Sequence, residues 1–155
     1  MNLLLHHVKN KYIKFWNNVY QNTLTINDLK ITDLVQSMCI FEDNKLIIGG
    51  NYILYLIDVK KNEIIMSLEI DGLFLSVKKT LDGNILCTVF NRNRNNHIIK
   101  YDIKNLKKIF EQKRAHKNPI FNCIQLNNGV IVSAEGRRNA DSYEIKFWKI
   151  LEKNK

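Results

Sequence analysis

Proline and glycine are scarce in this sequence, with one proline and six glycines among 155 residues. That scarcity excludes collagen-like and low-complexity chains. Long apolar runs are also missing, since nothing approaches the roughly 20 residues of a membrane-spanning helix. The amino terminus lacks the roughly 7–15 consecutive apolar residues of a secretory signal. Because apolar residues still make up 45% of the chain, we expect a globular protein with a packed core, in the cytoplasm or the nucleus.

Cysteine is scarce too, and Cys39, Cys87 and Cys123 lie 48 and 36 positions apart. An odd number without any CxxC pair argues against a disulfide framework and against a zinc site. Each cysteine lies in an apolar run, so we expect three buried, reduced thiols. His6 and His7 are adjacent and have no third metal ligand in view. The sequence therefore predicts no metal site and no cofactor.

Arginine is scarce among the basic residues, with five arginines against nineteen lysines. The net charge is +9, and residues 73–118 alone carry +8. Such an excess can indicate nucleic acid or an anionic membrane as a partner. AT-rich codons would also produce a composition rich in lysine and asparagine, however, and proteins that grip phosphates favour arginine. The net charge is therefore weak support for either partner.

The tetrapeptide IKFW occurs near both ends of the chain and points to an internal repeat. Trp16 and Trp148 are 132 residues apart, which is three times 44. A period near 44 should leave marks near residues 60 and 104, and "ILYLID" and "IIKYDI" lie there with the same alternation of apolar positions. Bulky residues hold one position of the period, and aspartate follows in the inner copies. We take as repeat anchors Trp16, Ile57, Asp58, Tyr101 and Asp102.

Each period also contains two further apolar runs joined by a short polar turn. The turns read "EDN", "LDG" and "NNG", which are typical of β-hairpins. Each unit is therefore predicted to contain four short antiparallel strands, rich in β-branched and aromatic residues. Residues 27–38 come closest to a helical period, but their β-branched residues favour an extended connector. Residues 104–114 could form a basic amphipathic membrane helix, but a last strand with its exit loop fits the repeat better.

Four strands in roughly 40–45 residues are typical of a β-propeller blade. Residues 115–150 resemble a WD-repeat unit almost throughout, with His116, Ser133 and Trp148 at the family's histidine, serine or threonine, and tryptophan positions. Asp141 matches the acidic residue of the turn, although it precedes the tryptophan by seven positions where six is usual. This resemblance implies a buried structural relay from tryptophan through serine and histidine to aspartate.

The last unit departs from the family at two positions, with Ala115 in place of glycine and Lys149 in place of aspartate. The resemblance covers residues 12–155, strongly in the last unit and weakly in the inner two. Kelch blades are the alternative, because Gly49 and Gly50 form a double glycine, but that pair occurs once and the period is too short.

The sequence thus predicts an all-β fold, an incomplete β-propeller of about 3 to 3.5 WD-like repeats. We expect open sheet edges at both ends, so further blades or self-association would be needed to cover them. The expected organisation begins with an N-terminal extension (1–11), followed by the third and fourth strands (c and d) of a first blade with a connector (12–32). Two blades (33–70 and 71–114) and an incomplete blade (115–155) come next.

A serine, a histidine and an aspartate also suggest a catalytic triad, but the sequence contains no GxSxG elbow and no second candidate site. We therefore expect no enzyme, and a protein-binding scaffold instead. All five arginines fall in three loops that a propeller brings to one face. These candidate residues for binding an acidic or phosphorylated protein segment are Arg92, Arg94, Arg114, Arg137 and Arg138.

The alternative function is a propeller associated with RNA or other nucleic acid, in a ribonucleoprotein or chromatin complex, and the net charge of +9 motivates it. A phosphoinositide-binding propeller would carry a Phe/Leu-Arg-Arg-Gly motif, whereas the chain reads Gly-Arg-Arg-Asn at residues 136–139. The residues alone do not identify the partner.

Overall fold

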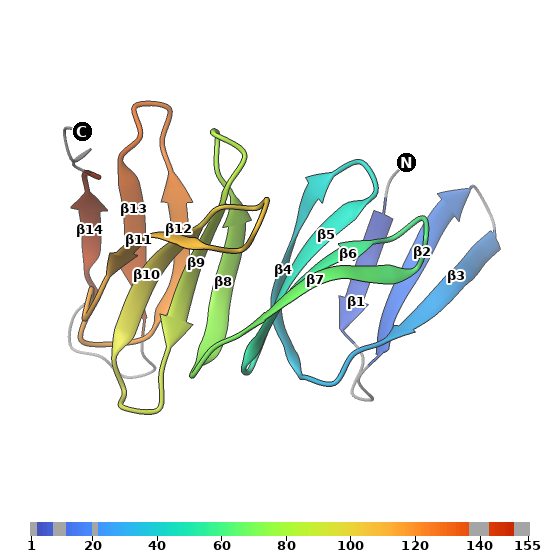
Figure 1. Ribbon diagram of the computed structural model, residues 1–155, viewed down its shortest axis with the longest axis horizontal. Helices are drawn as coiled ribbons and strands as arrows, with labels where there is room; N and C mark the ends of the chain where they lie inside the picture. The colour runs from blue at the N-terminus through green and yellow to red at the C-terminus, as the bar shows by residue number, and fades with distance from the viewer. Residues whose placement is uncertain (1–2, 8–11, 20–21, 137–142, 151–155) are drawn as a thin grey trace.

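The computed structural model describes the backbone of residues 3–7, 12–19, 22–136 and 143–150, and the side chains of residues 29–136 and 143–150. These parts of the chain form β-strands and turns without a helix, so none of their segments is a helix that could cross a membrane. The strands pair antiparallel in four sheets of three, four, four and three strands (Figure 1). This architecture confirms the predicted all-β class.

The first sheet has one more strand than predicted. It contains β1 (Leu3–His7), β2 (Tyr12–Val19) and β3 (Asn22–Lys30). The expected extension of residues 1–11 thus includes a strand, because β1 pairs along its whole length with Ile13–Asn17 of β2. This pairing supplies partners to backbone groups that β2 would otherwise leave at an open sheet edge.

The inner two sheets have four strands each, in sequence order. The second contains β4 (Val35–Glu42), β5 (Lys45–Gly50), β6 (Ile53–Asp58) and β7 (Glu63–Glu69). The third contains β8 (Leu73–Lys79), β9 (Ile85–Phe90), β10 (Asn96–Tyr101) and β11 (Lys108–Gln112). The basic segment 104–114 is therefore the last strand of its sheet together with the flanking turns, as the repeat predicts.

The last sheet has three strands, β12 (Ile120–Gln125), β13 (Ile131–Glu135) and β14 (Ile145–Trp148). Two of the predicted hairpin turns place glycine at positive φ, at Gly83 between β8 and β9 and at Gly129 between β12 and β13, with φ of 76° and 82°. This backbone conformation favours glycine, which explains the "LDG" and "NNG" sequences.

The segment predicted as an extended connector, residues 27–38, is mostly strand. It supplies the end of β3 and the start of β4, and only residues 31–34 connect the two. Asp33 fixes this short connector, because its carboxylate accepts backbone N–H groups from Leu34 (2.8 Å), Tyr52 (2.6 Å) and Ile53 (3.0 Å). The connector thus needs few residues, since one side chain satisfies three backbone donors.

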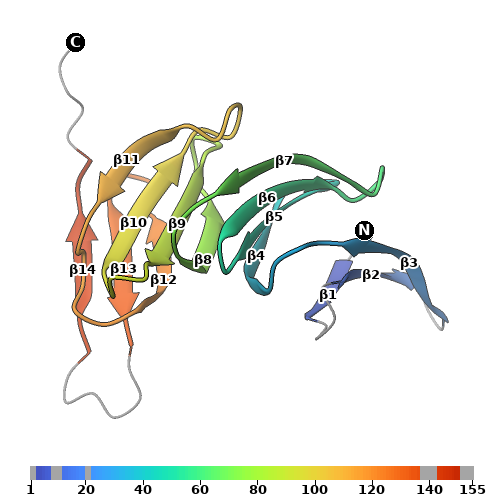
Figure 2. The same cartoon turned by 60° about the horizontal axis from the view of Figure 1, so that its bottom comes forward.

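The second, third and last sheets stack face to face (Figure 2), and side chains of neighbouring sheets form the cores between them. In the second sheet, alternation along the strands sends Leu46 and Ile48 to one face and Ile47 to the other, and all three are fully buried. Strands covered on both faces read as continuous apolar runs, which is why "KLIIGG" and "ILYLID" lack a polar face. These continuous apolar runs therefore indicate a sheet that is covered on both of its faces.

The turns of the last two sheets lie at two opposite edges of the stack. The β9–β10 turn and the segment from β11 to β12 lie at one edge, and the β8–β9 and β12–β13 turns lie at the other (Figure 1). We call the first of these edges the arginine edge, because its described segments hold Arg92, Arg94 and Arg114.

Candidate functional site

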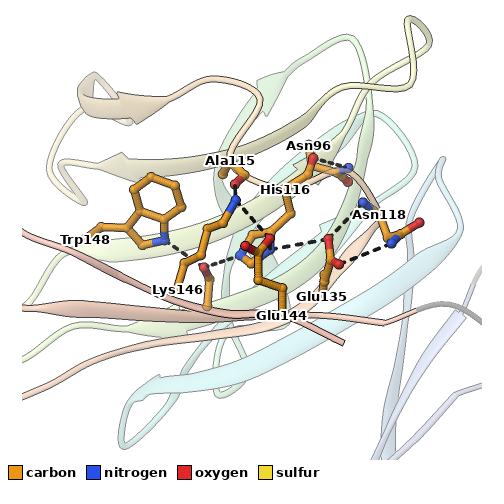
Figure 3. A network of polar contacts seen from close by, with 9 residues as sticks. Asn96, Ala115, His116, Asn118, Glu135, Glu144, Lys146 and Trp148 are labelled. Carbon is orange, nitrogen blue, oxygen red and sulfur yellow. Dashed lines mark hydrogen bonds and ion pairs between the residues drawn. The ribbon is translucent and has the colours of Figure 1, made fainter. Parts of the chain in front are cut away.

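A hydrogen-bonded relay connects the last sheet to the residues just before it, 115–119, which we call the entry segment of the last sheet (Figure 3). The indole Nε1–H of Trp148 donates to Ser133 Oγ at 2.7 Å, and His116 Nε2 lies 2.7 Å from the same oxygen. Ser133 lies on β13, Trp148 ends β14, and His116 precedes β12. The relay therefore joins three segments that are distant in sequence.

The hydrogen bonds of Ser133 and the charges around His116 together favour a neutral imidazole. A serine hydroxyl has one hydrogen, and Ser133 Oγ already accepts the indole N–H. If the hydroxyl donates to His116 Nε2, the imidazole proton lies on Nδ1, a buried atom that has no hydrogen-bond partner. Burial lowers the pKa of His116, and the ammonium group of Lys146 lowers it further, against the opposing effect of Glu135 and Glu144. Both effects favour the neutral ring.

Two glutamates face His116 Nδ1. Glu135 Oε2 lies 3.4 Å and Glu144 Oε2 lies 3.6 Å from that nitrogen, which are long distances for hydrogen bonds. Asn118 holds Glu135 in place by donating its backbone N–H at 3.0 Å and its side-chain amide at 3.2 Å. The predicted acidic member of the relay, Asp141, lies outside the described residues.

Sequence reasoning missed these glutamates, although a signal for one of them was present. Glu135 follows Ser133 by two positions on the same strand, so both side chains point to the same face. Glu144 pairs with Lys146, whose Nζ lies 3.0 Å from its carboxylate and donates to the Ala115 carbonyl at 3.0 Å. The register that sets Lys146 opposite Ser133 brings this lysine into the network.

The ligand atoms of His116, Glu135 and Glu144 lie within 4.8 Å of one another, close enough to surround a metal ion. Two features of the chemistry argue against that use. A metal ion would require Nδ1 to lose the proton that the Ser133 hydrogen bond places there. Lys146 also already balances the charge of Glu144. The arrangement is better explained as a polar network that ties the last sheet to its entry segment.

A second network occupies the third sheet and was not predicted. His97 Nδ1 lies 2.9 Å from Glu111 Oε1, and Asn91 Nδ2 lies 3.1 Å from His97 Nε2. Lys108 Nζ donates to the other oxygen of Glu111 at 2.6 Å. Burial opposes the charged form of Glu111, yet hydrogen bonds from Lys108 and His97 lower the pKa of its carboxyl. These residues join the β9–β10 turn, β10 and β11.

The repeat anchors divide into core residues and turn residues. Ile57 and Tyr101 are buried, and burial raises the pKa of the Tyr101 hydroxyl. Asp58 accepts the backbone N–H of Lys61 at 3.0 Å, and Asp102 accepts that of Lys104 at 2.8 Å, so both begin turns. The backbone of the remaining anchor, Trp16, pairs with Leu4 and Thr25, and its side chain lies outside the described part of the structure.

The candidate arginines are not equivalent. The guanidinium of Arg92 lies 3.1 Å from Asp71 Oδ1 and packs over the ring of Tyr52 at 5.1 Å, toward the second sheet. Arg114 is exposed, next to the entry segment of the last sheet. Arg137 and Arg138 lie outside the described residues.

Arg94 is the arginine that lines a groove. It lies in the β9–β10 turn, and its groove of about 530 Å³ runs between that turn and the entry segment of the last sheet. Lys117 supplies a second cation, which the sequence analysis did not select, and Phe90 and Phe121 supply apolar walls. We call this groove, with Arg94, Lys117, Phe90 and Phe121, the basic groove.

Comparisons with known proteins support the fold but reach no sequence family. No family model matches the sequence, and no curated protein matches it. The C-terminal WD40 domain of Sif2 is similar in structure, with a TM-score of 0.67 and 17% identity over 84% of this chain and 39% of that chain. A chain of the mitotic checkpoint complex has a TM-score of 0.66 and 16% identity over 97% of this chain and 46% of that chain.

The chain thus spans less than half the length of these two solved structures. Identities of this size show the fold alone. They agree with the four antiparallel sheets and with the repeat of about 44 residues in the sequence. The prediction of an incomplete WD-type propeller is confirmed, and the described sheets have the fold of WD40 β-propeller blades.

Proposed function

We propose that this chain is a non-catalytic, protein-binding scaffold of the WD40 type, and that the basic groove docks an acidic or phosphorylated protein segment. The observation that carries the proposal is the pairing of Arg94 and Lys117 with two phenylalanines in one groove at the arginine edge. Guanidinium and ammonium groups bind carboxylates and phosphates, and apolar walls bury the neighbouring side chains of a peptide.

The charge state of the groove supports this proposal. Arg92 is neutralised by Asp71, whereas no acidic side chain among the described residues forms an ion pair with Arg94 or Lys117. Two cations that keep their charge free at a concave surface attract anionic segments. A partner with acidic or phosphorylated residues beside an apolar residue would complement both parts of the groove.

Hydrogen bonds within the chain fix the conformation of the turn that carries Arg94, without a bound partner. Its backbone has a positive φ of 59° at Arg94. Asn91 accepts the Arg94 N–H through its carbonyl at 3.0 Å and the Asn95 N–H through its side chain at 2.9 Å. The Asn91 amide nitrogen then contacts His97, which links the turn to the network on Glu111. A pre-ordered turn reduces the entropy cost of binding.

Burial supports a non-catalytic role for the relay. Ser133 is 1% exposed and the His116 side chain is fully buried, so a substrate would have no access to either group. Their hydrogen bonds with Trp148 leave the hydroxyl engaged in the core. Hydrogen bonds of this kind in the core of a sheet stabilise a fold.

A peptide titration tests the proposed function. Fluorescence anisotropy would follow an array of Glu-rich and phosphoserine peptides, each with one leucine or phenylalanine, binding to the full 155-residue chain. We expect the double variant Arg94→Glu/Lys117→Glu to weaken binding at least tenfold, and added salt to weaken binding of the unmodified chain. A matched control, Lys104→Glu/Lys61→Glu, changes two exposed lysines outside the groove and should bind normally. Equal affinity for both double variants would refute the groove.

Single-stranded RNA in the same titration tests the alternative function. The net charge of +8 on residues 73–118 already subtracts Asp82 and Glu111, which pair with Lys100 and Lys108. Arg92 pairs with Asp71 outside this segment, so most of the basic excess has no acidic partner within the segment and RNA needs a direct test. Tighter binding of RNA than of every peptide, lost in the Arg94→Glu/Lys117→Glu variant, would replace the protein segment by nucleic acid as the partner.

A further inference from the structure

One face of the last sheet is apolar and uncovered. The strand register aligns Ile124, Val132 and Phe147 in one row across the sheet, and sets Ala134 beside Ile145 in the next. Phe147 is 69% exposed, Ile145 63% and Ile124 46%. The opposite face of this sheet packs on the third sheet through Ile120, Cys123 and Ile131. We call the uncovered face, formed by Ile124, Val132, Ala134, Ile145 and Phe147, the open face.

The equivalent face is buried in each of the two inner sheets. In the second sheet the matching row contains Cys39, Ile47 and Leu56, and the two aliphatic side chains are 0% and 4% exposed under the third sheet. In the third sheet Leu86 holds the matching central position and is fully buried under the last sheet. The repeat therefore builds each such face to receive another sheet, and no described segment of the chain covers the last one.

We propose that the open face binds a second copy of this chain, so that two copies close one ring of sheets head to tail. The lengths of the solved structures support this occupant. One chain spans 39% and 46% of the two WD40-type chains, so two copies supply about the length of one. Four sheets in each copy give eight in the pair, within the roughly 4–8 blades of closed propellers.

The way the sheets pack within the chain determines the geometry of the pair. The face of the second sheet that matches the open face packs on the opposite face of the third sheet, and the matching face of the third sheet packs in the same way on the last sheet. Contacts of this kind join two different surfaces, and they close a ring when the rotation permits. The open face of one copy would thus receive the first sheet of its partner, and the reverse contact would complete the ring.

The net charge provides a signature that separates this association from peptide docking. Each copy carries +9, so two copies repel one another, and salt that screens this repulsion should strengthen an apolar contact. Binding of an acidic segment in the basic groove should instead weaken as salt rises. The two proposals can therefore fail independently.

Size-exclusion chromatography with light scattering on the full chain tests the pair. We expect a species of twice the 18.3 kDa chain mass whose dissociation constant falls as salt rises. Phe147→Glu should raise that constant at least tenfold, because it places a charge among the apolar side chains of the open face. Leu81→Glu is the matched control, since Leu81 is 66% exposed in the β8–β9 turn, and it should leave the mass unchanged. A monomer at all concentrations, or open polymers, would overturn the proposal.

A cysteine variant distinguishes the head-to-tail pair from two open faces in contact. In the head-to-tail ring each copy of residue 147 lies in a different interface, so a Phe147→Cys variant should form dimers without a disulfide between the introduced cysteines. Two open faces packed on each other would bring these cysteines together, and rapid disulfide formation would overturn the proposed geometry. Circular dichroism of both residue-147 variants verifies that loss of the pair is not loss of the fold.

Discussion

Ser133 illustrates how one hydroxyl group can join two strands and the segment that precedes a third. Its oxygen lies 2.7 Å from both the Trp148 indole nitrogen and His116 Nε2, and its side chain is buried. The hydroxyl accepts one hydrogen bond and donates the other, so neither partner is left unsatisfied. Removing it would leave a buried N–H and a buried ring nitrogen without partners, which is costlier than never having buried them.

The first prediction concerns this shared hydroxyl. Ser133→Ala should lower the free energy of unfolding by about 2 kcal/mol, because it leaves two buried polar groups without a hydrogen bond. Urea denaturation followed by far-UV circular dichroism measures the effect. Ser67→Ala, on an exposed position of β7, is the control and should stay within about 0.5 kcal/mol of the unmodified chain. Equal midpoints for the two variants would show that the relay does not contribute to stability.

The relay also predicts a dependence of stability on pH. Burial and Lys146 lower the pKa of His116 from the ordinary value of 6.5, so the unfolded chain binds a proton at a higher pH than the folded chain. Stability is therefore retained above about pH 6.5 and decreases as the pH falls through that value toward the lower folded pKa. Urea midpoints from pH 8 to pH 5.5 should decrease, and His116→Gln should reduce the slope. A slope that His116→Gln leaves unchanged would contradict this origin.

At the scale of strands and sheets, the sequence was informative wherever the repeat was regular. The period of 44, the alternation in "ILYLID" and the hairpin turns predicted the strands of the second and third sheets. The "LDG" and "NNG" turns were predictable because glycine is favoured at the positive φ found at Gly83 and Gly129. At these positions the local sequence was sufficient to predict the strands and the turns.

The elements that sequence reasoning missed depend on contacts between distant segments. β1 is a short apolar run that becomes a strand because β2 offers it an edge, and nothing local specifies that pairing. The network of Asn91, His97 and Glu111 joins a turn and two strands whose register is set by the sheet. Lys117 was passed over in favour of the nearby Arg114, because only the folded chain shows which cation lies in the groove.

At the scale of the whole molecule, stability should be distributed unevenly along the stack. Repeat architectures gain their stability from contacts between neighbouring units. Among the described residues, the core between the second and third sheets contains 12 buried residues, whereas the core between the third and last sheets contains six. The contact between the second and third sheets is therefore the larger connection between the two halves of the chain.

Gly49 lies at this contact and provides the final prediction. A Cβ at this position would overlap Phe74 Cβ and lie 2.9 Å from Val77 Cγ1, so there is no space for even one methyl group. Gly49→Ala should destabilise the contact by about 1–3 kcal/mol through overpacking. Because the third and last sheets keep their own interface, hydrogen exchange should accelerate in β5 and β6 more than in β13. Uniform acceleration in all three strands would show that the stack unfolds as a single unit.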